Sequence, residues 1–134
     1  MNSRDVLVKL SDDYLAAVLT GDGDIVAALF APDGVVEDPI GAPVRRGYDQ
    51  LRAFYGQPRD IRLVRRIGPV TVYGRSAAFQ FEIRLTPREP PPGIPSGSEV
   101  SLVITDILTF GDDGRIVRMV GIPDALARAA PSGR

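Results

Sequence analysis

Asp106 is the residue whose type and position most clearly suggest chemistry. It lies in the segment SLVITDILTF, residues 101–110, which has the length and β-branched content of a strand. Side chains alternate along a strand, so Asp106 shares a face with the apolar residues Leu102, Ile104, Leu108 and Phe110. A carboxyl group on such a face is costly unless it is paired, hydrogen-bonded or protonated. The pattern therefore marks Asp106 as a candidate functional acid.

Tyr14 and Asp38 are two further candidates. Tyr14 lies on the apolar stripe of a predicted helix, so its ring should face inward and its hydroxyl should need a buried partner. Asp38 ends a short predicted strand just before Pro39, where a carboxylate has a fixed backbone and an accessible side chain. This is a good place for a catalytic base. Each residue also has a structural reading: a core tyrosine bonded to a carbonyl, and an Asp-Pro turn.

The composition restricts which chemistry is open to the chain. Its 134 residues contain no Cys, His or Trp, and Lys9 is the single lysine. Thiolate nucleophiles, zinc–sulfur sites and histidine bases are therefore excluded, which leaves carboxylates and hydroxyl groups as the main candidates. The net charge of −1 gives no indication of a nucleic-acid partner or an anionic membrane surface. The charged N-terminus and the lack of a long apolar run predict a cytoplasmic protein.

Three helices and several strands would have to position these side chains. The predicted helices span 3–20, 24–30 and 47–55, and in the last one Leu51, Phe54 and Tyr55 should pack inward. A turn is predicted at 31–34 and a hairpin turn at 111–114. The segment 87–97 contains five prolines and is predicted to be a long connection. Strands are predicted at 35–38, 61–67, 70–73, 76–86, 101–110 and 115–122.

The order of these elements predicts an α+β fold. A curved, mostly antiparallel sheet should wrap around the helices, and Tyr14, Asp38 and Asp106 could then face one interior. The length suits one domain, predicted at 1–124, and the small, polar segment 125–134 is predicted to be a flexible tail.

Several segments resemble the Δ5-3-ketosteroid isomerases, within the cone-shaped superfamily of nuclear transport factor 2-like folds. The resemblance runs from about residue 5 to residue 122 in the same order, and the segments that carry it are Tyr14 to Ala17, Val36 to Gly41, Phe54-Tyr55, Ile104 to Ile107 and Gly114 to Met119. It implies a cone of three helices and a bent sheet, a homodimer, a steroid substrate, and no metal or organic cofactor.

The resemblance also implies roles for individual residues. Asp38 would be the general base, while Tyr14 and a protonated Asp106 would form the oxyanion hole. Tyr55 would hydrogen-bond behind Tyr14, and the steroid would contact three residues, Phe54, Phe81 and Met119. A proton next to the carbonyl would leave for Asp38 and return two carbons away, which moves the double bond into conjugation.

Three departures put the substrate preference in question. Phe30 stands where some members carry a further tyrosine, which predicts a shorter hydrogen-bond network. Residues 121–123 replace a segment that often carries a bulky aromatic side chain, and the connection 87–97 is an insertion.

Two other functions remain open from the sequence. One is another enzyme of the same fold, such as an epoxide hydrolase or a polyketide cyclase; a dehydratase is disfavoured because the chain has no His. The other is a non-catalytic binder of a steroid or another flat apolar ligand. A purely structural interpretation is also open, in which Tyr14 is a core tyrosine, Asp38 belongs to a turn and Asp106 is a strand residue without a catalytic role.

Overall fold

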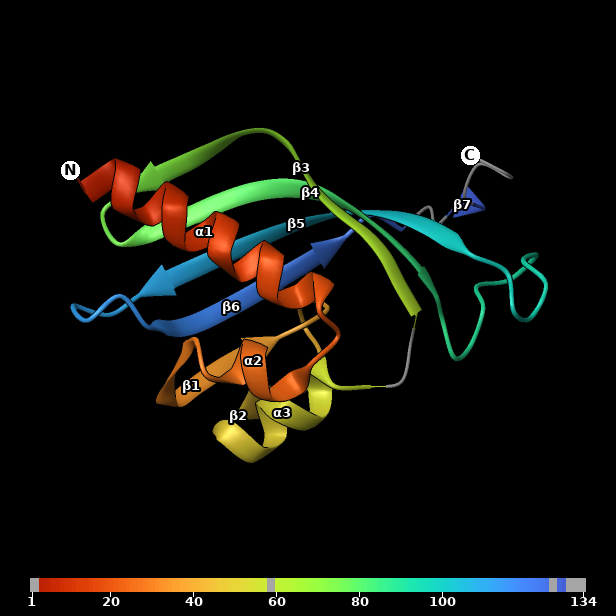
Figure 1. The fold of residues 1–134 in the computed structure, drawn as a ribbon, viewed down its shortest axis with the longest axis horizontal. Coiled ribbons are helices and arrows are strands. Elements are labelled where there is room, and N and C mark those ends of the chain that lie inside the picture. The colour runs from red at the N-terminus through yellow and green to blue at the C-terminus, as the bar shows by residue number, and fades with distance from the viewer. Residues whose placement is uncertain (1–2, 58–59, 126–127, 130–134) are drawn as a thin grey trace.

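The computed structural model describes residues 3–57, 60–125 and 128–129, and Figure 1 shows a curved sheet with helices on one side. Its strands are ordered β2-β1-β6-β5-β4-β3, with β7 added beside β5. The predicted α+β fold with a curved sheet is confirmed. The helices are α1 (Ser3–Leu19), α2 (Gly23–Ala27) and α3 (Tyr48–Tyr55), and the strands are β1 (Phe30–Glu37), β2 (Arg45–Arg46), β3 (Asp60–Tyr73), β4 (Ser76–Thr86), β5 (Val100–Phe110), β6 (Ile116–Pro123) and β7 (Arg128–Ala129).

The first helix lies along the sheet, while α2 and α3 gather at its β1–β2 end (Figure 1). The predicted apolar stripe of α1 faces the core, since Leu7, Tyr14 and Val18 are buried. Helix α2 begins after Asp22, whose carboxylate accepts hydrogen bonds from the backbone amides of Asp24 and Ile25. This cap satisfies amides that have no partner within a helix.

The sheet is mostly antiparallel, as predicted, with one parallel pair between β1 and β6. That pair joins the first strand of the chain to the last long one, so the end of β1 lies beside the end of β6. In its register Glu37 lies opposite Val120. The following residue, Asp38, is thereby brought to the neighbourhood of Gly121.

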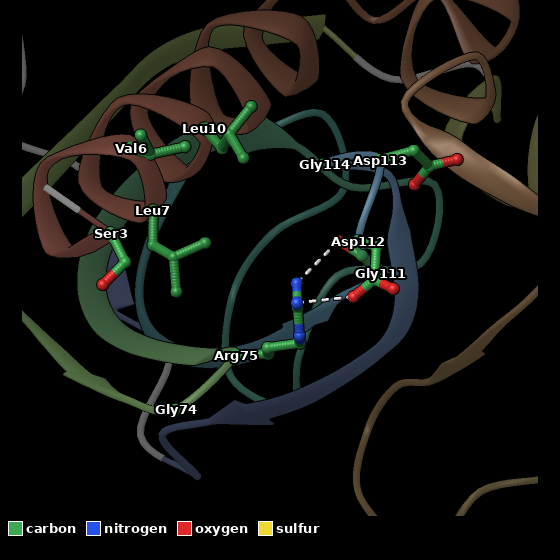
Figure 2. A pocket seen from close by; sticks show the side chains of 10 residues that line it. All are labelled: Ser3, Val6, Leu7, Leu10, Gly74, Arg75, Gly111, Asp112, Asp113 and Gly114. Carbon is green, nitrogen blue, oxygen red and sulfur yellow. Dashed lines mark hydrogen bonds and ion pairs between the residues drawn. The ribbon is translucent and has the colours of Figure 1, made fainter. Parts of the chain in front are cut away.

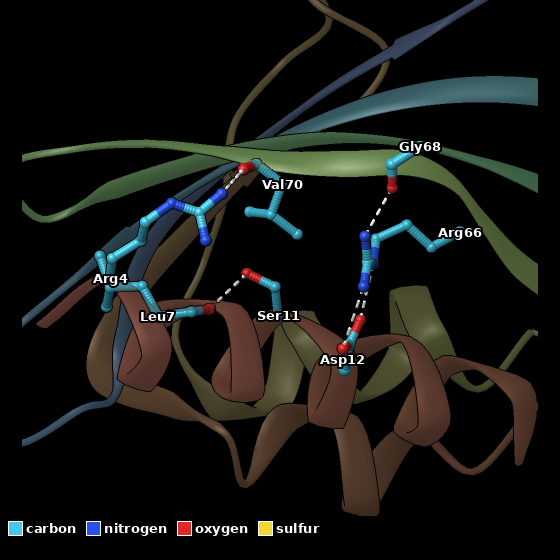
Figure 3. Close-up of polar contacts among 7 residues, drawn as sticks. All are labelled: Arg4, Leu7, Ser11, Asp12, Arg66, Gly68 and Val70. Carbon is cyan, nitrogen blue, oxygen red and sulfur yellow. Dashed lines mark hydrogen bonds and ion pairs between the residues drawn. The ribbon is translucent and has the colours of Figure 1, made fainter. Parts of the chain in front are cut away.

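Strand β3 contains a bulge that fastens α1 to the sheet (Figure 3). Its register with β4 shifts between Ile67 and Thr71, where Gly68 has the positive φ of 74°. The Arg66 side chain donates to the carbonyl of Gly68 and pairs with Asp12 of α1, at 2.8 Å from Nε to Oδ1. Arg4 of α1 donates to the carbonyl of Val70 at 2.9 Å. Carbonyls displaced from the ladder by the bulge are thus bonded to arginines.

The structure adds detail at three predicted segments. The turn predicted at 31–34 is instead an irregular stretch inside β1, whose register with β6 shifts between Phe30 and Val35. The strand predicted at 61–67 and its predicted continuation at 70–73 form one strand, β3, with a bulge at Gly68 and Pro69. Within the segment predicted to be a flexible tail, Arg128 and Ala129 pair with β5. The tail residues 126–127 and 130–134 lie outside the described residues.

The core fills the space between the helices and the concave face of the sheet. Its most deeply buried side chains include Tyr14, Val26, Val36, Leu51, Leu108 and Met119. Among the residues that the structure describes, no helix is both long enough and apolar enough to cross a membrane.

Candidate active site

Six of the seven residues predicted for the site line one cavity of about 80 Å³ at the concave side of the sheet. They come from α1, α3, β4, β5 and the end of β1, which are far apart in the sequence. The six are Tyr14, Asp38, Phe54, Tyr55, Phe81 and Asp106, and the rest of the lining is aliphatic: Val18, Ile83, Leu85, Leu102 and Ile104. The fold therefore brings the candidate acid, the candidate base and the tyrosine pair to one apolar space.

Tyr14 points from α1 into the interior and is 1% exposed. Its hydroxyl shares a hydrogen bond with the Tyr55 hydroxyl, with 2.8 Å between the two oxygens. The two rings meet edge to face, with centroids 6.1 Å apart. Burial first, and then the neighbouring Tyr55 and Asp106, raise the pKa of Tyr14 well above its usual range. Tyr14 therefore keeps its proton at neutral pH and remains a hydrogen-bond donor.

Asp106 lies in the middle of β5 and is 2% exposed. It is paired across the sheet with Phe79 on β4 and Gly121 on β6. Within the described part of the chain, its Oδ1 is the only buried side-chain oxygen or nitrogen that has no hydrogen-bond partner. A buried polar atom of this kind needs a partner or a function.

The surroundings of Asp106 favour the protonated acid. Burial, and then the charge of Asp38, raise its pKa well above the usual range, while a hydrogen bond with Tyr14 acts in the opposite direction. Because the two raising effects prevail, the neutral carboxyl group, whose proton can be donated, is the favoured form. Tyr14 and Asp106, the two candidate donors, line the same cavity.

Asp38 directly follows β1, as predicted for the end of that strand. Its backbone carbonyl accepts a long hydrogen bond, 3.4 Å, from Nη1 of Arg45 on β2. The amide of Ile40, two residues later, donates to the carbonyl of Gly121 at 2.8 Å. The Ile40 contact holds the segment of Asp38 against the end of β6, and the Asp38 side chain lines the cavity.

The aromatic residues form the wall between α3 and the sheet. The Phe54 and Tyr55 rings meet edge to face with centroids 4.9 Å apart, and Phe81 is almost fully buried. Phe30 stands where some members of the resembled family carry a further tyrosine. Its ring centroid lies 5.9 Å from that of Tyr55, and it brings no hydroxyl group to the site. The wall is therefore apolar except for the tyrosine hydroxyls.

Met119, the seventh predicted residue, does not line the cavity. It is 1% exposed and lies between Val36 of β1 and Leu108 of β5. It shares the face of Gly121 but lies two residues earlier on β6, among core side chains instead of at the cavity wall. The family resemblance implied that Met119 contacts a steroid, whereas in the structure its side chain is part of the core.

The sequence did not predict that Arg45 and Gly121 contact residues of the site. Arg45 belongs to the two-residue strand β2, too short to leave a pattern, and its guanidinium carbon lies 4.5 Å from the centroid of the Phe54 ring. In the sequence, Gly121 belongs to a segment that stands out only because it lacks an aromatic side chain. The signal that could have found it is a glycine inside a strand, which often marks a close approach of other groups.

A second hollow, of about 580 Å³, lies between the first turns of α1 and two hairpin turns (Figure 2). One wall is apolar, from Val6, Leu7 and Leu10. Opposite it, Arg75 is paired with Asp112 and donates to the carbonyl of Gly111. Its exposed charges thus already neutralise one another. None of the seven predicted residues lines it, so its larger volume does not make it the reactive site.

The cavity brings together Asp38, a candidate base, with Tyr14 and Asp106, two candidate proton donors. An oxygen bound by both donors would be stabilised if it gained negative charge, while Asp38 could accept a proton from a nearby carbon. Among the described residues, no group of three or more carboxylate side chains is arranged to hold a metal ion. A carboxylate and two hydroxyl-bearing groups at one apolar cavity are the kind of arrangement that enolisation of a carbonyl compound requires.

Comparisons with known proteins found a matching family model, a similar sequence and a similar fold. The family model of the SnoaL-like domain matches residues 12–119. The chain is 33% identical over 107 residues to the steroid Delta-isomerase of Nocardioides simplex, which covers 79% of this chain and 80% of the relative. Among solved structures, the epoxide hydrolase/cyclase-like enzyme SalBIII, described for pyran ring formation in the polyether salinomycin, superposes with a TM-score of 0.83. It is 20% identical and covers 97% of this chain and 100% of its own, a likeness of fold alone.

Proposed function

The chain belongs to the family of SnoaL-like domains, and from that premise we propose that it is a steroid Δ-isomerase. The reaction moves the double bond of a 3-oxo-Δ5-steroid to the conjugated Δ4 position. The proposal is supported most by one observation: Asp106 is a buried acid with a raised pKa and an unpartnered Oδ1, in the same cavity as Tyr14 and Asp38.

Each residue has a defined role in the proposed reaction. The Asp38 carboxylate takes the proton from the carbon between the carbonyl and the double bond. The electron pair of that C–H bond moves toward the carbonyl oxygen, giving a dienolate whose charge is stabilised by hydrogen bonds from Tyr14 and Asp106. Asp38 then returns the same proton to the far end of the dienolate. The overall change is an isomerisation, with no net gain or loss of atoms or electrons.

The remaining cavity residues have supporting roles in this proposal. Tyr55 holds the hydroxyl of Tyr14 by the 2.8 Å hydrogen bond, while Phe54 and Phe81 offer apolar surface to a flat ring system. Met119 is not included among the substrate contacts, because it is buried outside the cavity.

The size of the cavity sets a condition on binding. Its volume of about 80 Å³ is well below the roughly 300–1,000 Å³ of pockets that enclose drug-sized ligands. A steroid therefore requires movement of the lining side chains. A homodimer and a cytoplasmic location remain predictions from the resemblance and the sequence.

The test is the absorbance of the conjugated enone formed from a Δ5-3-ketosteroid. We expect turnover by the wild-type protein, and a loss of about 100- to 10,000-fold in kcat for Asp38→Asn. Binding of a phenolic steroid, which needs only the two donors, should persist in that variant. Asp33→Asn, at an exposed aspartate of β1, is the matched control and should keep full activity. Wild-type protein without activity above background would contradict the proposal.

A second candidate, epoxide opening, is favoured by one specific observation. Asp38 and Asp106 are two carboxyl groups close enough for the charge of one to raise the pKa of the other. An ionised base and a neutral acid can activate a water and protonate the epoxide oxygen. Consumption of an epoxide with no enone formation would favour this candidate, and phenol binding with neither reaction would indicate a non-catalytic binder.

A further inference from the structure

Gly121 lies in the same cross-strand row as the candidate acid. On β5, Asp106 is paired with Phe79 of β4 on one side and with Gly121 of β6 on the other. Directly paired residues project their side chains from the same face of a sheet. A side chain at position 121 would therefore stand next to that of Asp106, on the cavity side.

The carboxylate of Asp38 occupies this place. A Cβ atom built on Gly121 would lie 2.7 Å from the carboxyl carbon of Asp38, 2.7 Å from Oδ1 and 3.1 Å from Oδ2. Ordinary contacts of a Cβ atom lie at 3.4–4 Å. Alanine at this position would therefore force the carboxylate, or the backbone that holds it, to move.

Backbone conformation does not account for the glycine. The positive-φ glycines of the described chain do not include Gly121, so its backbone conformation is open to other residues. Glycine inside a strand lowers stability because it packs no side chain and loses more freedom on folding. The close approach of Asp38 is the reason that the structure offers for a glycine here.

We propose that Gly121 is a positioning residue for the reaction: it lacks a side chain and so leaves the place beside Asp106 to the carboxylate of Asp38. This inference rests on the proposed function and adds a determinant of its geometry. The carboxylate of Asp38 lies above Gly121, which is the cross-strand partner of Asp106, so both acids face the same part of a substrate. Gly121 does not touch the reacting atoms itself and acts through Asp38.

The proximity has an electrostatic consequence that agrees with this role. The charge of Asp38 is the second cause, after burial, of the raised pKa of Asp106. Among the described residues, the titratable groups that line the cavity with Asp106 are Asp38 from the end of β1, Tyr14 from α1 and Tyr55 from α3. The position of Asp38 against Gly121 therefore helps to keep Asp106 protonated. Displacement of Asp38 would weaken both the base and the proton donor Asp106.

The first experiment is a double-mutant cycle on activity. We expect Gly121→Ala to lower kcat about 10- to 100-fold, because a displacement of about 1 Å at a reacting group can cost that much. KM should change less than threefold, and in the Asp38→Asn background the same substitution should cost less than twofold. Gly111→Ala, a glycine without positive φ in the β5–β6 hairpin, is the matched control and should leave kcat unchanged. Wild-type kcat for Gly121→Ala, or equal losses in both backgrounds, would overturn the inference.

The second experiment is a cycle on stability and does not need turnover. Gly121→Ala should shift the urea midpoint downward in the wild-type background, and less so in an Asp38→Ala background, where the clashing carboxylate has been removed. Equal shifts in both backgrounds would overturn the inference. If the wild-type protein lacks isomerase activity, the proposed function fails while this cycle still decides whether Asp38 is seated on Gly121.

Discussion

Asp106 and Glu82 are two buried carboxyl groups on neighbouring strands of one sheet, and their environments are opposite. Glu82, on β4, accepts hydrogen bonds from Ser101 at 2.7 Å, Arg84 at 2.9 Å and Arg65 at 2.7 Å. The bond from Ser101, and then the bond and charge of Arg84, lower its pKa. Asp106 has an Oδ1 without a partner among the described residues and a raised pKa.

The difference lies in which groups each face of the sheet supplies. Around Glu82, arginines and a serine compensate the charge, so the acid is ionised and helps to hold β3, β4 and β5 together. Around Asp106, the neighbouring groups are an aspartate, a tyrosine and aliphatic side chains, so the neutral acid is favoured. A buried acid is favoured as a proton donor when no cation lies close enough to compensate its charge. Burial alone does not distinguish such an acid from an ionised one such as Glu82.

The largest expected effect separates the two acids by activity. Asp106→Leu removes one of the two donors to the developing oxyanion, so kcat should fall about 100- to 1,000-fold. Its affinity for a phenolic steroid should fall as well. Glu82→Gln, which alters the other acid, should keep kcat within about twofold of wild type. Turnover is measured by enone absorbance. Unchanged turnover in Asp106→Leu would contradict a catalytic role for Asp106 and the functional difference from Glu82.

The next effect separates them by stability. Glu82→Gln should lower the free energy of unfolding at pH 7 by about 1–3 kcal/mol, because charged hydrogen bonds are lost. The pKa of Glu82 is lowered in the folded state, so its contribution is present above the unfolded pKa and is lost as pH falls through the folded pKa. Urea unfolding should therefore show the difference shrinking below about pH 4. A difference independent of pH would mean that the charge of Glu82 is not what stabilises the fold.

The smallest effect has the opposite sign. The pKa of Asp106 is raised in the folded state, so its contribution to stability is present below the unfolded pKa and is lost as pH rises toward the folded pKa. Asp106→Asn, a neutral group of the same shape, should avoid this loss and be more stable than wild type at pH 7 by about 0.5–2 kcal/mol. The gain should vanish near pH 3 in the same urea experiment. A variant less stable than wild type at pH 7 would contradict a neutral Asp106.

The contrast also explains what the sequence could and could not predict. Asp106 was recognisable because a carboxyl group interrupts an apolar face, and Tyr14 because it lies on an apolar helical stripe. Glu82 alternates with apolar residues on β4, and this alternation by itself predicts an exposed polar side chain. Its burial depends on Arg65, from another strand, and Ser101, from a third. Partners that meet only across the sheet leave no periodic signal in any one segment.

The error in the fold has the same origin. The irregular start of β1 contains Gly and Pro residues, which predict a turn locally, but the pairing to neighbouring strands continues through them. Met119, which the family resemblance implied as a steroid contact, lies two residues before Gly121 on β6 and is buried in the core. The role of Gly121 was not predictable from its own segment, because it depends on Asp38, 83 residues earlier in the numbering.

The arginines at the bulge of β3 also bear on how the protein avoids aggregation. β3 is the last strand of the sheet and, at 14 residues, a long one. A long, regular edge strand exposes backbone groups to which the strand of another molecule can add. Here the bulge interrupts the edge, α1 packs along it, and the carbonyls of Gly68 and Val70 are already bonded to Arg66 and Arg4. The contacts that fasten α1, and with it Tyr14, therefore also protect this edge from pairing with a second chain.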